Sequence, residues 1–259
     1  MEKLLIQANG KINLDFKVLN KREDGYHNIE STFQSINLSD FLIFEKFNSN
    51  ELTGAEICPG SEDLIYQAKK LLEEKVGKKL PAKIHLQKTI PVAAGFGGGS
   101  ADAAATLFGL NLIYNLDLSK EELAEIGVEI GADVPFFFYG GTCQVKGIGE
   151  KISKIKKKLP KFFVIFRPHK RVETEKVYNM YDETGERFPV IAEKICPEIG
   201  VLKKYFSKFD LEMKLTGSGP SVFCETDKYS IAKKVAGDYP EFNGDIFICH
   251  PQNKALKVL

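Results

Sequence analysis

The sequence predicts an α+β fold with mainly antiparallel strand pairing, divided into two domains. Two observations predict it: segments that alternate apolar and polar residues, as half-buried strands do, and apolar stripes at helical spacing, which occur in both halves of the chain. A lysine-rich stretch, residues 151–161, separates the halves. We therefore expect an N-terminal domain over residues 1–158 and a C-terminal domain over residues 159–259.

The first half contains the clearest signals for individual elements. Residues 11–18 alternate and predict a half-buried strand, and Asp24-Gly25 predicts the turn after it, because glycine supplies the positive φ of a tight turn. Ser119 and Glu122 form a capping box, which predicts the start of a helix. The other expected elements are strands at about 29–47 and 83–90, a helix opened by Ser61, and an alanine-rich helix over 101–115.

The second half is expected to alternate strands and helices by the same two periodicities. Gly237 is expected to end the last helix, because glycine is common where helices stop. The expected strands are 162–166, 211–215, 221–225 and 245–249, and the expected helices are about 173–181, 190–206 and 227–236.

Composition narrows the classes of function. The chain has 36 Lys and Arg against 35 Asp and Glu, so its net charge of +1 argues against a nucleic-acid partner. The lysine run at 154–158 is interpreted as a solvated face. Five scattered cysteines without a C-x-x-C pair indicate free thiols in a reducing compartment, and no apolar run approaches the roughly 20 residues of a membrane span. We expect a cytoplasmic protein without a membrane anchor.

A glycine-rich segment lies between a predicted strand and a predicted helix. Glycine occupies positions 95, 97, 98 and 99, and Ser100 follows. Glycines let the backbone approach a ligand closely, and the helix start offers unpaired N–H groups, so the segment predicts a phosphate site. The alternative is a mobile loop in which Ser100 is a plain N-cap. The Walker pattern is absent, and the spacing departs from the dinucleotide fingerprint at its third glycine position.

Asp133 and Lys11 are two charges whose roles the pattern leaves open. Asp133 is the one charged residue between Ile130 and Val145, and a lone carboxylate in apolar surroundings needs a partner or a function. It could equally cap a helix. Lys11 lies on the polar side of its strand, where a lysine is usually just exposed to solvent.

Five segments together resemble a known family. They are Gly10-Lys11-Ile12-Asn13-Leu14, Asp24-Gly25-Tyr26-His27, the stretch from Pro91 to Ala104, the stretch from Gly131 to Phe137, and Gly217-Ser218-Gly219-Pro220. In this order and spacing the chain resembles the 4-diphosphocytidyl-2-C-methyl-D-erythritol kinases of the GHMP kinase superfamily. The first two segments are the most specific to that family.

The resemblance implies a two-domain GHMP kinase fold: an N-terminal domain like the second domain of ribosomal protein S5, and a ferredoxin-like C-terminal domain. It implies transfer of the γ-phosphoryl group of ATP, with Mg²⁺, to the 2-hydroxyl of 4-diphosphocytidyl-2-C-methyl-D-erythritol, on the non-mevalonate route to isoprenoid precursors. Ligands would lie between the domains of a monomer or homodimer. No metal ligand of the chain is predicted.

The resemblance also implies roles for individual residues. Asp133 would accept the hydroxyl proton and Lys11 would keep it ionised. The residues implied to bind the cytidyl substrate are Asn13, Tyr26, His27, Thr174 and Tyr178. The residues implied to bind ATP are Leu64, Lys88, Pro91, Gly95, Gly97, Gly98, Gly99, Ser100, Gly217, Ser218 and Gly219.

The chain departs from the family pattern at a few places. Ala101 stands where a second serine is frequent, Asp63 where asparagine is common, and Asn9-Gly10 where Pro-Ala is usual. The alternatives are another GHMP kinase, of mevalonate or homoserine type, and a non-catalytic nucleotide-binding regulator. The first would turn over an acceptor without a cytidyl group, and the second would bind ATP without turnover.

Overall fold

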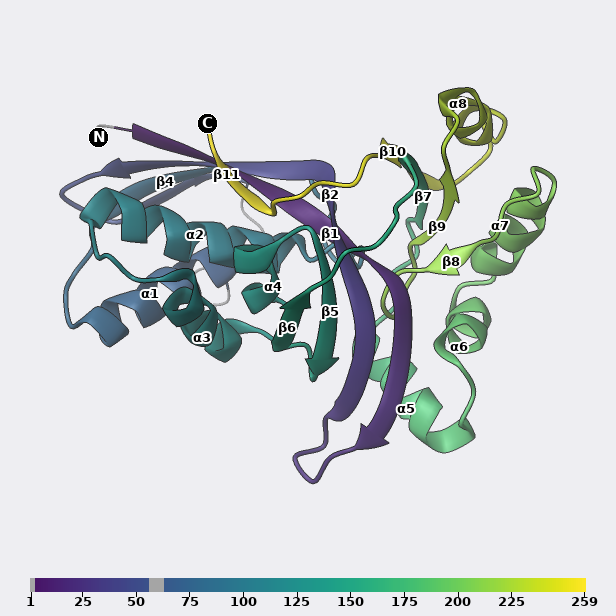
Figure 1. The fold of residues 1–259 in the computed structure, drawn as a ribbon, viewed down its shortest axis with the longest axis horizontal. Helices are drawn as coiled ribbons and strands as arrows, with labels where there is room; N and C mark the ends of the chain where they lie inside the picture. The colour runs from purple at the N-terminus through teal and green to yellow at the C-terminus, as the bar shows by residue number, and fades with distance from the viewer. Residues whose placement is uncertain (1–2, 56–62) are drawn as a thin grey trace.

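Two long antiparallel strands, β1 (Lys3–Lys21) and β2 (His27–Lys46), run through the first sheet and beyond it as a hairpin. The computed structural model describes residues 3–55 and 63–259. The pairing shifts register three times, between Asn9 and Lys11 among other places, so the strands bend as they cross the molecule. The hairpin therefore reaches the second half of the chain, beside helix α5 (Figure 1).

The first sheet has the order β11-β1-β2-β4-β3, with β5 on the outer part of β2 and β6 on β5. Its pairs are antiparallel except β3 with β4. The other strands are β3 (Glu51–Gly54), β4 (Ala82–Gln87), β5 (Thr142–Gly147), β6 (Lys151–Lys154) and β11 (Leu256–Val258).

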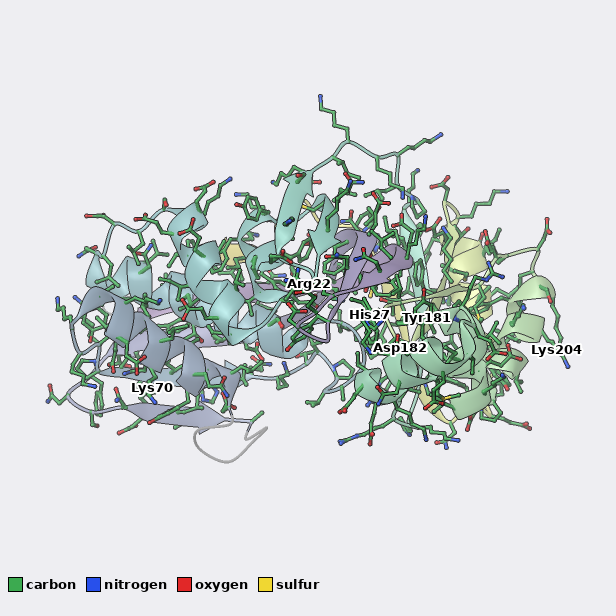
Figure 2. The ribbon with its side chains drawn as sticks, turned by 90° about the horizontal axis from the view of Figure 1, so that it is seen from below. Arg22, His27, Lys70, Tyr181, Asp182 and Lys204 are labelled. Carbon is green, nitrogen blue, oxygen red and sulfur yellow. The ribbon has the colours of Figure 1, made fainter. Side chains whose placement is uncertain are left out.

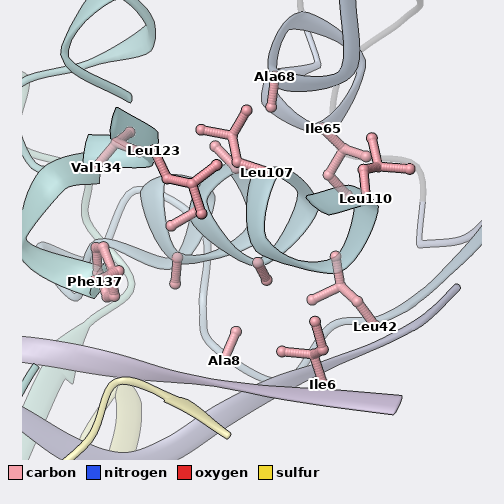
Figure 3. Close-up of a cluster of buried hydrophobic side chains, with 14 of the residues drawn as sticks. Ile6, Ala8, Leu42, Ile65, Ala68, Leu107, Leu110, Leu123, Val134 and Phe137 are labelled. Carbon is pink, nitrogen blue, oxygen red and sulfur yellow. The ribbon is translucent and has the colours of Figure 1, made fainter. Parts of the chain in front are cut away.

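Four helices lie on one side of this sheet: α1 (Leu64–Val76), α2 (Gly98–Tyr114), α3 (Lys120–Ile130) and α4 (Val134–Tyr139). Helix α2 is apolar around most of its circumference, so it is buried between the sheet and α1. Figure 3 shows Leu107 and Leu110 of α2 among side chains of the strands and of α1. At Gly109 the helix approaches β2 so closely that a Cβ would lie 2.7 Å from the Phe44 ring.

The second sheet is antiparallel throughout, in the order β10-β7-β9-β8. Its strands are β7 (Phe162–Pro168), β8 (Lys214–Leu215), β9 (Val222–Thr226) and β10 (Gly244–Cys249), and its helices are α5 (Thr174–Thr184), α6 (Phe188–Ile195), α7 (Glu198–Ser207) and α8 (Tyr229–Gly237). Val164 and Phe166 of β7 pack with the helices, whereas Phe163 and Ile165 pack against Ile12 of β1. This shared apolar layer joins the two sheets.

The structure confirms the α+β fold with mainly antiparallel pairing and corrects several boundaries. The helix expected over 190–206 is two helices, because α6 ends at Ile195 and Pro197 begins a new turn. The strand expected at 211–215 keeps only β8, and the strand expected to reach Ile90 ends at Gln87. Strands β3, β5, β6 and β11 and helix α4 were not predicted.

Helix starts differ from expectation in two places. Asp63 is the N-cap of α1, and its carboxylate accepts the backbone N–H of Ile65 at 2.8 Å; the expected opener, Ser61, lies outside the described residues. Helix α2 begins at Gly98, three residues earlier than expected. The capping box of α3 is formed as predicted.

A single boundary in the sequence does not separate the two sheets, because the first sheet contains strands from both ends of the chain. The expected division at 158 falls between β6 of the first sheet and β7 of the second. The last strand, β11, returns to the first sheet and pairs with β1. Within the described ranges, the helices are too short or too polar to cross a lipid bilayer.

Candidate active site

Two neighbouring cavities hold most of the predicted site residues. The larger, about 590 Å³, lies between the β1–β2 hairpin, the glycine-rich segment and α5. The smaller, about 260 Å³, lies between the start of α1 and the glycine-rich segment. Both are lined by Gly95 and Gly97, so the glycine-rich segment is the wall that they share.

Lys11 and Asp133 form an ion pair in the larger cavity. Lys11 is on β1, where its side chain is only 6% exposed, and its Nζ lies 3.2 Å from Asp133 Oδ2. Asp133 precedes α4, and its side chain makes no capping hydrogen bond to a described residue. Lys11 is therefore not an exposed strand lysine, and Asp133, although it is the N-cap residue of α4, directs its carboxylate to Lys11.

Lys11 is held from two further sides. Its Nζ donates to Asn13 Oδ1 at 2.9 Å and lies 4.4 Å from the centre of the Phe33 ring. Both faces of β1 are covered here, by α2 and α4 on one side and by the second sheet on the other, which is why the expected half-buried strand is fully buried from Ala8 to Leu14. A lysine without free rotation presents one fixed ammonium to the cavity.

Asn13 connects the pair to the second half of the chain. Its backbone N–H donates to Thr216 Oγ1 at 2.9 Å, and its side-chain amide donates to Ser31 Oγ at 3.1 Å. Thr216 directly follows β8. These bonds fix the Asn13 amide beside Lys11, and they make its position depend on both sheets.

The glycine-rich segment is positioned by main-chain bonds. The N–H of Lys11 donates to the carbonyl oxygen of Phe96 at 2.9 Å, and Ser221 Oγ donates to that of Ala94 at 2.7 Å. Gly97 has φ +67° and is itself the N-cap of α2, so Ser100 is not that cap. A Cβ at Gly98 would lie 2.9 Å from Lys88 Nζ, which shows how closely the backbone passes over this lysine.

A buried triad of ionisable side chains lies beneath the smaller cavity. Lys88 Nζ lies 2.6 Å from a carboxylate oxygen of Asp40 and 2.6 Å from one of Asp102. Asp40 also accepts the N–H groups of Thr89 and Ile90. Burial raises the pKa of Asp102 to about 8; Lys88 opposes this shift and Asp40 adds to it.

The far end of the larger cavity is aromatic. His27 stacks on Tyr178 with ring centres 5.0 Å apart, and Tyr26 lies at the rim with 61% of its surface exposed. Burial raises the pKa of Tyr178 to about 12, and the charge of Asp133 contributes to that rise, so its hydroxyl stays protonated at neutral pH. Thr174 lies one turn before Tyr178 and its hydroxyl contacts Ser218 Oγ at 2.9 Å.

The structure brings most predicted residues together around the two cavities. All five residues predicted for the substrate line the larger cavity, while Leu64, Lys88, Pro91, Gly98, Gly99 and Ser100 line the smaller. Gly217 and Ser218, which were predicted to bind ATP, line the larger cavity, as do Gly95 and Gly97. Gly219 is in neither lining.

Some residues of the site escaped the sequence analysis. Asp182 contacts His27 Nε2 at 2.7 Å and Lys21 Nζ at 2.5 Å. The hydrogen bond from Lys21 lowers the pKa of Asp182, and that from His27 adds to the effect. Its spacing of four residues from Tyr178 was the available signal, since both share a helix face. Asp40 has no comparable signal, because its partners are far away in sequence.

Two family models match the chain. The model described as "GHMP kinases N terminal domain" matches residues 63–141, and "GHMP kinases C terminal" matches residues 176–244. The first match contains the glycine-rich segment and Asp133, and the second contains Tyr178 and Gly217.

Curated relatives match over most of their length. A 4-diphosphocytidyl-2-C-methyl-D-erythritol kinase of Caldicellulosiruptor bescii is 45% identical over 84% of this chain and 87% of its own. One from Listeria innocua is 35% identical over 98% of both chains. One from Bacillus cereus is 38% identical over 85% of this chain and 87% of its own.

Solved structures share the fold. The crystal structure of a 4-(cytidine 5'-diphospho)-2C-methyl-D-erythritol kinase superposes with a TM-score of 0.80 at 29% identity, covering 97% of this chain and 99% of its own. A homoserine kinase from Cytophaga hutchinsonii reaches 0.77 at 16% identity, covering 100% and 98%. The second likeness concerns the fold alone.

Proposed function

The chain belongs to the 4-diphosphocytidyl-2-C-methyl-D-erythritol kinase family of the GHMP kinases, and we propose that it transfers the γ-phosphoryl group of ATP to the 2-hydroxyl of 4-diphosphocytidyl-2-C-methyl-D-erythritol. One observation carries the proposal: the two cavities share Gly95 and Gly97, and the Lys11–Asp133 pair lies on the larger side of that wall. A phosphate chain held by the loop from the smaller cavity would end beside the pair.

The ion pair supplies the proton chemistry. Asp133 accepts the proton of the acceptor hydroxyl as its oxygen attacks the γ-phosphorus. Lys11, 3.2 Å away, favours the ionised carboxylate and stabilises negative charge that develops on the transferring group. Asn13 shares a hydrogen bond with Lys11 and orients the acceptor beside it.

The glycine-rich segment supplies the phosphate site. Positive φ at Gly95 and Gly97 turns the backbone around the cavity, and the first N–H groups of α2 point toward it with the positive end of the helix dipole. At such sites Mg²⁺ is bound mainly by oxygen atoms of the phosphates and retains several water ligands. The residues present fit that mode, because Ser100 lines the smaller cavity beside the glycines and has a hydroxyl that could bind the ion. Bound Mg²⁺ would neutralise phosphate charge.

The aromatic end suits a nucleobase. Tyr26 and Tyr178 offer ring faces for stacking, and His27 offers a ring nitrogen for the edge of the base. Stacking accepts any base, so the choice of base depends on hydrogen bonds at its edge. Mevalonate and homoserine contain no base to bind at this end of the cavity, which argues against those two alternatives.

The proposed function is tested by ADP release from ATP and Mg²⁺ with two acceptors: 4-diphosphocytidyl-2-C-methyl-D-erythritol, and its analogue without the cytidine. We expect kcat/KM for the analogue to be lower by at least about a hundredfold, because the binding energy of the base is lost. Equal turnover of both acceptors would contradict the cytidyl assignment. ATP binding without turnover on any acceptor would favour a regulator.

A further inference from the structure

Asp182 joins three elements at the base end of the larger cavity and has no part in the phosphoryl transfer described above. It is on α5, one turn after Tyr178, and contacts Lys21 at the end of β1 and His27 at the start of β2. Figure 2 shows His27, Tyr181 and Asp182 together between the two halves of the molecule. The second half of the chain thus contacts the histidine through a charged hydrogen bond.

The chemistry of this contact decides which ring nitrogen carries a proton. An ionised carboxylate only accepts hydrogen bonds, and Asp182 already receives one from Lys21. Nε2 of His27, 2.7 Å from the other carboxylate oxygen, must therefore be the donor. In a neutral imidazole with Nε2 protonated, Nδ1 holds a lone pair and accepts a hydrogen bond.

The ring is also held against rotation. It stacks on Tyr178 and meets the edge of Tyr181 with ring centres 5.9 Å apart. The His27 side chain is 5% exposed, yet it lines the larger cavity. Among the hydrogen bonds between described residues, those of the His27 ring involve Nε2, so Nδ1 is the nitrogen left to bind a ligand.

We propose that Asp182 is a positioning residue that holds His27 with Nδ1 as a hydrogen-bond acceptor and thereby selects cytosine over uracil. This inference rests on the proposed function. Cytosine presents an amino donor at the position where uracil presents a carbonyl acceptor. An acceptor at Nδ1 can receive a hydrogen bond from the amino group of cytosine. With uracil, the lone pair of Nδ1 would face a lone pair of the carbonyl oxygen. A site built to form a hydrogen bond strongly rejects a ligand that cannot form it.

The proton assignment is tested by ¹⁵N NMR of the full-length protein labelled at histidine. His27 is assigned among the four histidines by comparison with His27→Asn. We expect a neutral ring with the proton on Nε2 in the wild type, and a mixture of tautomers in Asp182→Ala. A proton on Nδ1 in the wild type, or an unchanged tautomer in Asp182→Ala, overturns the role of Asp182.

The selectivity is tested by steady-state kinetics with the cytidyl substrate and its uridyl analogue. Asp182→Ala is expected to raise KM for the cytidyl substrate and to lower the preference for cytidyl over uridyl, each by about tenfold, the value of one good hydrogen bond. The kcat and the KM for ATP are expected to stay within about twofold, because Lys11, Asp133 and the glycine-rich segment are untouched. Asp182→Asn retains an acceptor oxygen and is expected to lie between wild type and Asp182→Ala.

Glu183→Gln is the matched control. Glu183 is the next residue on α5 and is exposed, so its substitution removes one negative charge without touching His27. An unchanged cytidyl preference in Asp182→Ala, or a loss of kcat alone, overturns the selectivity. If the wild-type protein does not phosphorylate the cytidyl substrate, the proposed function fails, and the tautomer measurement still decides whether Asp182 sets the proton of His27.

Discussion

At the scale of single residues, the Lys11–Asp133 pair is a costly arrangement that its position in the cavity explains. Lys11 is almost fully buried and Asp133 is one-third exposed toward the cavity. A pair of this kind adds little stability compared with apolar side chains of similar size. In the proposed mechanism its value is chemical, because it places a carboxylate and an ammonium side by side in the larger cavity, next to the glycine-rich segment.

The proposed role of Asp133 as a base leads to the first prediction. Asp133→Asn keeps the size of the side chain and an oxygen for Lys11 but cannot take up a proton. We expect kcat to fall by about 10²- to 10⁴-fold with little change in either KM. Single-turnover phosphorylation measures the step directly. Full activity of this variant would exclude Asp133 as the general base.

The buried triad of Lys88, Asp40 and Asp102 leads to a prediction about pH. The ordinary pKa of an aspartate is 3.8, and burial raises that of Asp102 to about 8. Between these values the unfolded chain has lost this proton and the folded protein keeps it, so the contribution of Asp102 to the free energy of unfolding falls as pH rises.

Asp102→Asn removes this dependence because an amide does not titrate. The wild-type free energy of unfolding, minus that of the variant, is expected to fall between about pH 5 and pH 8 and to level off above. Urea titrations across this range measure it, with the exposed Glu125→Gln as the control. A difference that stays constant with pH would show that Asp102 is ionised in the folded protein.

At the scale of elements, the glycine-rich segment and α2 form one unit. The helix starts inside the segment, and a Cβ at Gly97 would lie 3.0 Å from the Phe137 ring and 3.2 Å from the side chain of Lys11. Gly77, the C-cap of α1, has a similar φ of +63°, but a Cβ there would have no atom within 4 Å among the described residues. The two glycines share a backbone conformation and differ in surroundings.

This pair of glycines gives a matched prediction. Gly97→Ala and Gly77→Ala should each lose about 1–3 kcal/mol of stability from backbone strain. Only Gly97→Ala should also lose turnover, by about tenfold or more, because Lys11 must move. Urea unfolding and kcat measurements separate the two effects. An equal loss of turnover in both variants would contradict the prediction that a side chain at position 97 acts through Lys11.

At the scale of the whole molecule, the site depends on contact between the two sheets. The apolar layer of Ile12, Phe163 and Ile165 joins them, and the Thr216–Asn13 hydrogen bond extends that junction to the ion pair. Since β11 also returns to the first sheet, the two halves are linked at more than one point. The position of Asn13 therefore depends on how the two halves of the chain pack together.

Thr216→Val tests this junction with little change in shape. It leaves the buried N–H of Asn13 without its acceptor, so we expect a loss of about 1–3 kcal/mol in the free energy of unfolding and a higher KM for the acceptor substrate. Thr53→Val, at an exposed threonine of β3, should stay within about 0.5 kcal/mol of wild type. Similar values for both variants would contradict a structural link through Thr216.

The sequence by itself determined the fold class and the chemical character of the site. Alternation and capping patterns are local, so they located β1, β7 and the capping box of α3, and the glycine-rich segment indicated a phosphate site. The resemblance implied that Lys11 acts on Asp133, but tertiary structure alone decided that Lys11 is buried with its Nζ beside that carboxylate and that Asp182 reaches across to His27. These pairings join residues more than a hundred positions apart, where no periodicity operates; only packing brings the groups within hydrogen-bond distance.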